Sequence, residues 1–184
     1  MKSAAKVVRK MTDVSLNLNI EDDRWATALP NVSALAEKVK AVTFAYVYEN
    51  EKTILQTLNK HTFVNVCLSN DATVQVLNRD FRGLDKPTNV LSFANIDFAD
   101  FAAENSCFKE TDLGDIILAY ETMAAEAEMQ QISLEAHFCH LLVHGFLHIL
   151  GYDHMTNDEA EIMENLEIRI LAQLNIANPY EENV

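Results

Sequence analysis

The stretch HLLVHGFLHILGYDHM, residues 140–155, joins an apolar helical pattern to regularly spaced histidines. His144, His148 and His154 have the spacing H-x3-H-x5-H. Residues four apart on a helix share one face and lie about 6 Å apart along the axis, so the first two imidazoles can bind one ion. Gly151 suits the left-handed residue that ends a helix, and the reversed chain would return His154 to the other two. The stretch therefore predicts a helix that ends in a metal site.

Three neutral imidazoles that leave a fourth position open are typical of catalytic rather than structural zinc sites. We therefore expect one divalent metal ion per chain, with Zn²⁺ as the expected ion. His137 lies 11 residues before His148. That spacing is about 16 Å along a helix axis, too far for the two residues to share an ion. His140 is expected to be either a hydrogen-bond donor behind the metal ligands or a residue that only packs in the protein interior.

The same spacing occurs in the zinc metalloprotease helix H-E-x-x-H-x-x-G-x-x-H, where the glutamate activates metal-bound water. Gly145 occupies the position of that glutamate here. The helix would then supply ligands but no base. A metallopeptidase is therefore the weaker hypothesis, and a charged catalytic group must come from another segment.

That group is expected in NRDFRGLDKPTNVLSF, residues 78–93. Arg79, Arg82 and Lys86 lie there in a bend punctuated by glycine and proline. The forked donors of arginine suit a phosphate, and a cation beside a metal-activated nucleophile stabilises charge that develops on phosphorus. We expect these three residues to bind substrate. The alternative is that they are solvated residues at the end of a helix.

Outside these segments, hydrophobic periodicity predicts strands and helices in mixed order. The expected strands cover residues 14–20, 53–58, 62–69, 88–93 and 115–120. The expected helices cover residues 31–48, 70–78, 121–129, 134–150 and 158–174. Residues 95–112 are expected to be irregular. Mixed strands and helices, followed by helices alone, predict an α+β layer fold in a single compact domain.

Two of the expected helices have recognisable ends. Ser69 or Asn70 can cap the second helix, and Gly83 can end it. Thr156 and Glu159 have the spacing of a capping box at the start of the last helix.

The 184 residues, 49% hydrophobic and 23% charged, have the balance of a water-soluble globular protein. No run of about 18 apolar residues is present, which excludes a membrane-spanning helix and argues against a membrane partner. The basic N-terminus has no apolar stretch and no export cleavage pattern. Three cysteines form no paired framework and indicate reduced thiols in the cytoplasm: Cys67, Cys107 and Cys139. We expect a flexible basic extension at residues 1–12, a catalytic domain at 13–178 and a C-terminal tail at 179–184.

Charge is distributed unevenly along the chain. Residues 1–86 hold 12 Lys/Arg against 10 Asp/Glu, whereas residues 87–184 hold only Lys109 and Arg169 against 18 acidic residues. The formal net charge of −14 repels nucleic acid in general. An anionic ligand must therefore approach over the first half or be held by a bound cation. The simpler alternative is that the acidic half serves only solubility.

Taken together, these segments resemble the YbeY endoribonuclease family, the bacterial rRNA maturation factors. The resemblance spans residues 60–175 and rests on NRDFRGLDKPTNVLSF, LGDIIL at 113–118, HGFLHILGYDH at 144–154 and EIMENLEIRIL at 161–171. Phe81 stands where tyrosine is common in the family, and Arg82 is in place. Residues 1–12 and 97–110 resemble nothing diagnostic.

The resemblance implies a cytoplasmic, metal-dependent enzyme that hydrolyses phosphodiesters of single-stranded RNA. It also implies a mixed four-stranded sheet packed with several helices. The implied role is rRNA processing, especially maturation of the 3′ end of 16S rRNA, together with ribosome quality control. The implied partners are the small ribosomal subunit and its assembly factors, and no DNA is expected. Arg82 and His144 match functional residues of the family and are expected to be catalytic. The alternative is a ribosome assembly factor in which the metal is mainly structural.

Overall fold

A four-stranded mixed sheet forms the centre of the fold. The computed structural model describes residues 13–51, 55, 58, 61–97, 101 and 110–181. The strands are β1 (Val14–Ile20), β2 (His61–Ser69), β3 (Val90–Ala94) and β4 (Glu110–Ala119), in the spatial order β1-β2-β4-β3. β1, β2 and β4 are parallel, whereas β3 runs antiparallel to β4. The α+β class and the mixed sheet expected from the sequence are confirmed.

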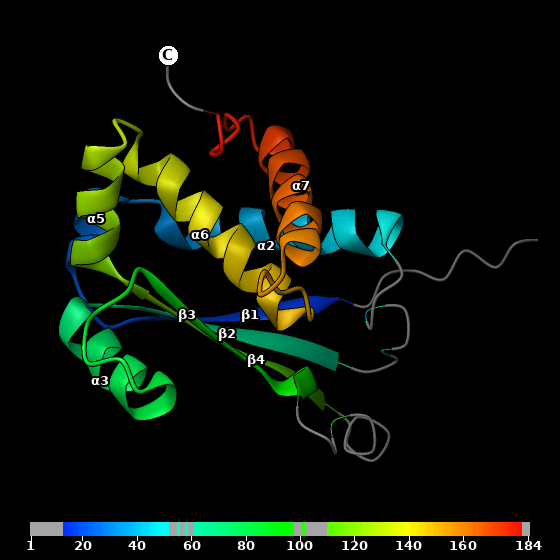
Figure 1. Cartoon of the computed structure of the whole chain (residues 1–184), viewed down its shortest axis with the longest axis horizontal. Coiled ribbons are helices and arrows are strands. Elements are labelled where there is room, and N and C mark those ends of the chain that lie inside the picture. Colours follow the sequence, from blue (N-terminus) through cyan, green and yellow to red (C-terminus); the bar gives the residue numbers. More distant parts are fainter. Residues whose placement is uncertain are drawn as a thin grey trace, which may run out of the picture.

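Helices cover the two faces of this sheet unequally (Figure 1). α2 (Val32–Asn50), α6 (Leu134–Ile149) and α7 (Asn157–Gln173) lie on one face, with α5 (Tyr120–Met129) beside α6. α3 (Asp71–Arg82) lies on the other face. The short α1 (Arg24–Ala28) follows β1, and the 3-10 turn η2 (Asn95–Asp97) follows β3. α6 contacts α2, α5, α7 and two strands, so the helix that carries the histidines is the central one.

Apolar side chains from the strands pack into both helical layers. In β2, Val64, Val66 and Leu68 are buried, as their alternation predicts, and they share the main core with Phe138 and Phe146 of α6. Complete burial of side chains of this kind contributes about 1.5–3 kcal/mol each. A smaller cluster lies between α3 and the sheet: Val74, Leu91, Ile117 and Ala119. The two clusters hold α6 and α3 against opposite faces of one sheet.

The predicted helix ends are confirmed. The Asn70 side chain accepts a hydrogen bond from the backbone N–H of Thr73 at 3.0 Å and caps α3. Gly83 ends α3 in the left-handed conformation. Thr156 and Glu159 form a complete capping box at the start of α7.

Several predicted boundaries need correction. Most of the strand expected at residues 53–58 lies outside the described residues, and the two that are described, Leu55 and Leu58, are buried without belonging to a strand. β4 begins at Glu110, inside the stretch predicted to be irregular, because Thr111 and Leu113 already alternate into the core. α1 was not predicted, since five residues are too few to show a helical period. The extension expected at residues 1–12 lies outside the described residues. None of the described helices is long and apolar enough to span a membrane.

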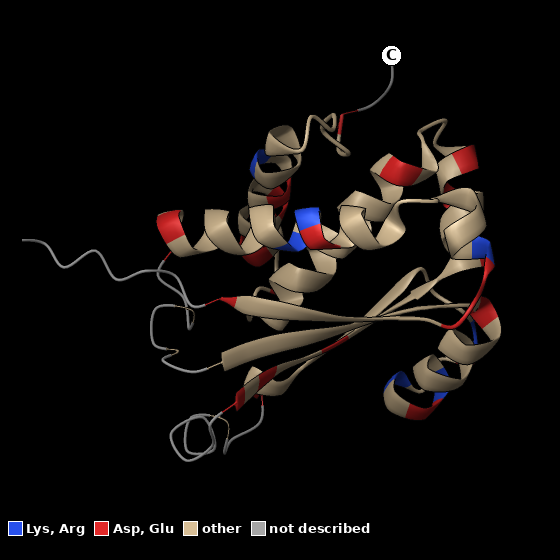
Figure 2. Cartoon of the chain, turned by 180° about the vertical axis from the view of Figure 1, so that it is seen from behind, with Lys and Arg blue, Asp and Glu red and all other residues tan. Residues whose placement is uncertain are grey.

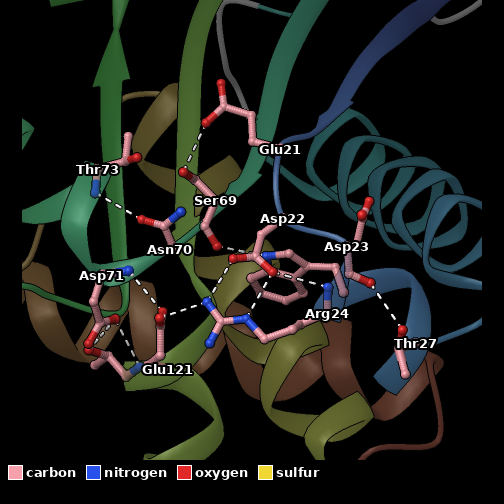
Figure 3. A network of polar contacts seen from close by, with 12 residues as sticks. Glu21, Asp22, Asp23, Arg24, Thr27, Ser69, Asn70, Asp71, Thr73 and Glu121 are labelled. Carbon is pink, nitrogen blue, oxygen red and sulfur yellow. Dashed lines mark hydrogen bonds and ion pairs between the residues drawn. The ribbon is translucent and has the colours of Figure 1, made fainter.

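The carboxyl ends of the three parallel strands meet in a polar corner (Figure 3). Arg24 donates two hydrogen bonds to Asp22, at 2.7 and 2.9 Å, and a third to Glu121 at 2.6 Å. Glu121 also accepts from the backbone N–H of Asp71 at 2.9 Å. In return, Asp71 accepts from the backbone N–H of Thr122 at 3.0 Å. Through this exchange, the first turns of α3 and α5 hold each other in place.

Candidate metal centre

α6 places His144 and His148 on one face, as their spacing predicts. Their Nε2 atoms lie 3.0 Å apart. Two nitrogens bound at 2.0–2.1 Å to a tetrahedral zinc ion lie about 3.3–3.4 Å apart. The two imidazoles are therefore already close to the separation of two ligands of one ion.

Gly151 reverses the chain after α6. Its φ is +88°, and its N–H donates to the carbonyl of His148 at 2.9 Å, while the N–H of Tyr152 donates to the carbonyl of Leu147 at 3.0 Å. This pair of bonds is a Schellman ending. A Cβ at position 151 would lie 2.7 Å from Cδ1 of Ile96. The backbone conformation therefore favours glycine here, and a side chain would also displace the end of Ile96.

The reversal returns His154 to His144 and His148 on α6, as predicted. Its ring centroid lies 5.3 Å from that of His144 and 5.0 Å from that of His148. One potential ligand atom from each of the three residues lies within 4.8 Å of the others. His144 and His148 are half-buried, whereas His154 is exposed. Three converging nitrogens with one exposed side fit a divalent ion that keeps a further coordination position.

Each of the two candidate ligands on α6 is oriented by a hydrogen bond from its Nδ1 atom. Nδ1 of His144 donates to Oε1 of Glu167 at 2.8 Å, and Nδ1 of His148 donates to the carbonyl oxygen of Tyr152 at 2.9 Å. An imidazole that carries its hydrogen on Nδ1 keeps the lone pair on Nε2. Both rings therefore direct an Nε2 lone pair toward the shared position, as metal-binding histidines do.

Electrostatics favour the protonation states that ligation needs. Burial, assisted by the neighbouring His144 and His154, lowers the pKa of His148 to about 4. Burial would raise the pKa of Glu167, but hydrogen bonds from His140, His144 and Tyr180 outweigh it and lower the pKa to about 2. Near neutral pH, a neutral imidazole thus faces the ion position and an ionised carboxylate stands behind it.

Arg82 lines the same cavity as the three histidines. This cavity has a volume of about 800 Å³. The segment after Arg82 contributes further polar lining groups from Thr88, Asn89 and Ser92. The sequence-predicted arginine and metal ligands, which come from distant parts of the chain, are therefore brought to one site.

The other two predicted substrate-binding residues lie outside the lining of this cavity. Arg79 is exposed on α3 and forms an ion pair with Asp80 at 2.9 Å. Lys86 is exposed in the bend that follows α3. Figure 2 shows basic residues on α3 and acidic residues spread over the helices and strand ends. Any contact that Arg79 and Lys86 make with a substrate would therefore lie beyond the cavity.

A buried asparagine holds the bend next to Arg82. Nδ2 of Asn78, a residue that is 2% exposed, donates to the carbonyl oxygen of Lys86 at 2.8 Å. The N–H of Leu84 donates to the carbonyl of Asn78 at 3.3 Å. These bonds turn the chain from α3 toward β3, so Arg82 stands at a fixed corner of the cavity rather than on a free helix end.

Gly145 occupies a position with no room for a side chain. A Cβ at this position would lie 2.9 Å from Cγ2 of Ile116 on β4 and 3.3 Å from Oγ of Ser92. A glutamate, which the metalloprotease mechanism needs here, would therefore collide with the sheet. The packing of α6 supports the sequence argument against a peptidase.

Sequence reasoning missed Glu167, which is fully buried behind His144. A signal was present: Glu167 lies within the buried stripe of α7 formed by Met163, Leu166, Ile170 and Leu171. A carboxylate on such a stripe must have buried partners.

The two other histidines of α6 lie outside the candidate metal group, as expected. His140 donates to Glu167 at 3.0 Å and so stands behind the ligands, one of its two predicted roles. His137 is buried, and its Nε2 pairs with Glu126 at 2.8 Å.

Comparisons with known proteins identify the family of this chain. The family model described as "Endoribonuclease YbeY" matches residues 19–175. A protein of that name from Rhizobium etli is 42% identical over 171 residues, which cover 93% of this chain and 95% of the relative. The corresponding protein from Paramagnetospirillum magneticum is 43% identical and covers 92% of this chain and 97% of its own. A solution structure from Thermotoga maritima, TM1509, matches 91% of this chain and 100% of its own with a TM-score of 0.49 and 19% identity.

A layered α+β fold with three convergent histidines and an arginine in one cavity is thus found in a chain whose relatives are hydrolases of the endoribonuclease class. Within that class, the chain belongs to the YbeY family.

Proposed function

We propose that this chain is a metal-dependent endoribonuclease, specific for single-stranded RNA, that acts in the cytoplasm on rRNA. Its proposed roles are maturation of the 3′ end of 16S rRNA and ribosome quality control. The observation that carries the proposal is the shared cavity of Arg82, His144, His148 and His154. Membership of the YbeY family supports RNA as the substrate.

The residues of the cavity would have two roles, metal binding and phosphate binding. His144, His148 and His154 would hold one divalent ion, and Zn²⁺ is the proposed ion because three imidazoles with an open position are typical of catalytic zinc sites. When bound, such an ion supplies Lewis-acid activation of water and positive charge beside a phosphate. Arg82 would hold the scissile phosphate by a forked pair of hydrogen bonds and stabilise the negative charge that grows during cleavage. Arg82 and His144 are the proposed catalytic residues.

The acidic surface supports delivery of the RNA by partners rather than tight capture. Arg79 and Lys86, on the exposed side of the bend, would contact phosphates that flank the cleaved one. Few such contacts give weak intrinsic affinity for RNA. We therefore propose that the small ribosomal subunit and its assembly factors present single-stranded rRNA to the cavity, with no role for DNA.

A matched set of variants tests the proposal. Wild type, Arg82→Ala and Arg169→Ala would be purified in parallel, loaded with zinc, and assayed on one RNA supplied as single strand, as duplex and as the DNA equivalent. Arg169 is exposed on α7, so its loss changes the net charge equally. We expect cleavage of the single-stranded RNA alone, lost in Arg82→Ala and kept in Arg169→Ala. Equal cleavage by all three proteins would indicate a contaminating nuclease. A zinc-loaded wild type with no cleavage would instead favour a structural metal.

A further inference from the structure

A buried carboxylate links the candidate metal centre to the C-terminal end of the described chain. Glu167 on α7 has no exposed surface. Its Oε1 accepts from Nδ1 of His144 at 2.8 Å, and its Oε2 accepts from Nε2 of His140 at 3.0 Å. The hydroxyl of Tyr180 donates to the same Oε2. Three donors, two from α6 and one from the segment beyond α7, therefore converge on one side chain.

The convergence restricts how each group can be arranged. A carboxylate only accepts hydrogen bonds, so every partner must present a hydrogen. His144 must then carry its hydrogen on Nδ1 and leave Nε2 free. An unpaired charge at this depth would be strongly destabilising, so the buried carboxylate depends on this set of donors.

The residue that completes the set comes from the segment 178–181, beyond the last helix. Asn178 accepts from the backbone N–H of Tyr180 at 3.0 Å, which closes a local turn after α7. The Tyr180 ring then packs edge-on against His140, with centroids 5.7 Å apart and planes at 82°. Tyr180 as a residue is 42% exposed, so its hydroxyl reaches inward from the surface.

We propose that Glu167 is a positioning residue that fixes His144 as an Nε2 ligand, and that Tyr180 holds Glu167 in place for this task. The chain end would then be part of the support of the metal centre. The proposal rests on the metal site of the proposed function. It goes beyond that function by assigning roles to two residues that lie outside the cavity.

Two variants separate the roles of the two residues. Glu167→Gln keeps the shape and removes the charge, and Tyr180→Phe removes one hydroxyl at a half-exposed position. Glu161→Gln is the matched control, since Glu161 is exposed on the same helix. Zinc affinity would be measured by competition with a chelator. We expect a loss of about 10–100-fold for Glu167→Gln, the usual effect of removing such a partner, a smaller loss for Tyr180→Phe and none for the control.

A second measurement does not depend on bound metal. Long-range ¹H–¹⁵N NMR spectra of the metal-free protein report which ring nitrogen of His144 carries the hydrogen. We expect the Nδ1–H form in wild type and in Glu161→Gln, and a shift toward the Nε2–H form in Glu167→Leu, which has no acceptor. Wild-type zinc affinity in Glu167→Gln, or an unchanged His144 tautomer in folded Glu167→Leu, would overturn the proposal. If wild type itself bound no zinc, the proposed metal site would fail, whereas the tautomer would still decide the role of Glu167.

Discussion

Nδ1 of His148 donates a hydrogen bond to the carbonyl oxygen of Tyr152 at 2.9 Å. This bond spans the reversal at Gly151, so the turn that returns His154 also sets the orientation of His148. Two of the three candidate ligands therefore depend on a single backbone conformation.

Gly151→Ala should weaken both the fold and the metal site. An L-residue in the left-handed region costs about 1–2 kcal/mol, and the new Cβ would also press against Ile96. Urea denaturation and zinc competition would measure the two effects. Gly83→Ala is the control, because Gly83 also has a positive φ, at +72°, but nothing lies within 4 Å of its Cβ position. We expect Gly83→Ala to lose stability and keep its zinc affinity. Equal zinc affinity in the two variants would contradict the coupling.

Alanine at any of His144, His148 or His154 should sharply reduce bound metal. Each substitution removes one of three nitrogens from the group. Metal content per chain, measured by mass spectrometry after dialysis against zinc, checks this. His61→Ala is a suitable control, since His61 is exposed on β2, away from α6. A triple alanine variant that keeps one tightly bound ion per chain would show that the ligands lie elsewhere.

Arg82→Ala should retain metal and fold while losing most of the activity. Removal of one donor to a developing charge typically costs about 100–1000-fold in rate. Arg82→Lys should recover only part of this, because a point charge cannot reproduce the forked donors. Single-turnover cleavage of a defined single-stranded RNA, with metal content measured in every sample, provides the comparison. Full activity in the lysine variant would argue for a simple charge effect.

Lys86→Glu should reduce RNA binding more than Lys38→Glu. Both residues are exposed and both changes alter the net charge equally, but Lys86 lies in the bend next to Arg82, whereas Lys38 lies on α2. Affinity for a short single strand should also fall only gently with salt, since each neutralised phosphate contributes a logarithmic slope of about 0.7. Fluorescence anisotropy across a salt series measures both quantities. Equal losses in the two variants would exclude an approach of RNA over the bend.

The corner around Arg24 should stabilise the fold above about pH 4. Hydrogen bonds from the Arg24 side chain and backbone lower the pKa of Asp22 to about 2. Because the unfolded chain has the ordinary, higher pKa, it binds more protons between these values, and the stabilisation is lost as the pH falls toward 2. We expect Asp22→Asn to be less stable than wild type at pH 7, with the difference shrinking toward pH 2. Chemical denaturation at several pH values tests this, with the exposed neighbour Asp23→Asn as control.

Local signals made part of the site predictable. Three of these signals act within a few residues, so the local sequence is enough to predict the structure that they produce. They are the spacing of His144 and His148, the glycine at position 151 and the Asn70 cap. The alternation of Val64, Val66 and Leu68 likewise determines which face of β2 is buried.

Contacts between distant elements were not predictable in the same way. Glu167 meets His144 only because α7 packs against α6, and no local pattern specifies that packing. The early start of β4 combines the local alternation of Thr111 and Leu113 with pairing to β2, and this pairing is non-local. The position of Glu167 within the apolar stripe of α7 indicates that a buried hydrogen-bond donor must face it. It does not indicate which residue supplies that donor.

Reciprocal hydrogen bonds fix the first turn of α3 against α5, so the length of α3 decides where its last residue lies. Its first residue, Asp71, is tied to Glu121 and Thr122, and its last residue, Arg82, lies in the cavity. Twelve helical residues span about 18 Å, and each added residue turns the end of a helix by about 100°. One inserted or deleted residue within α3 would swing the guanidinium around the helix axis and out of reach of the histidines. Apart from Arg79 and Arg82, this helix should therefore tolerate exchange of its exposed side chains far better than any change in its length.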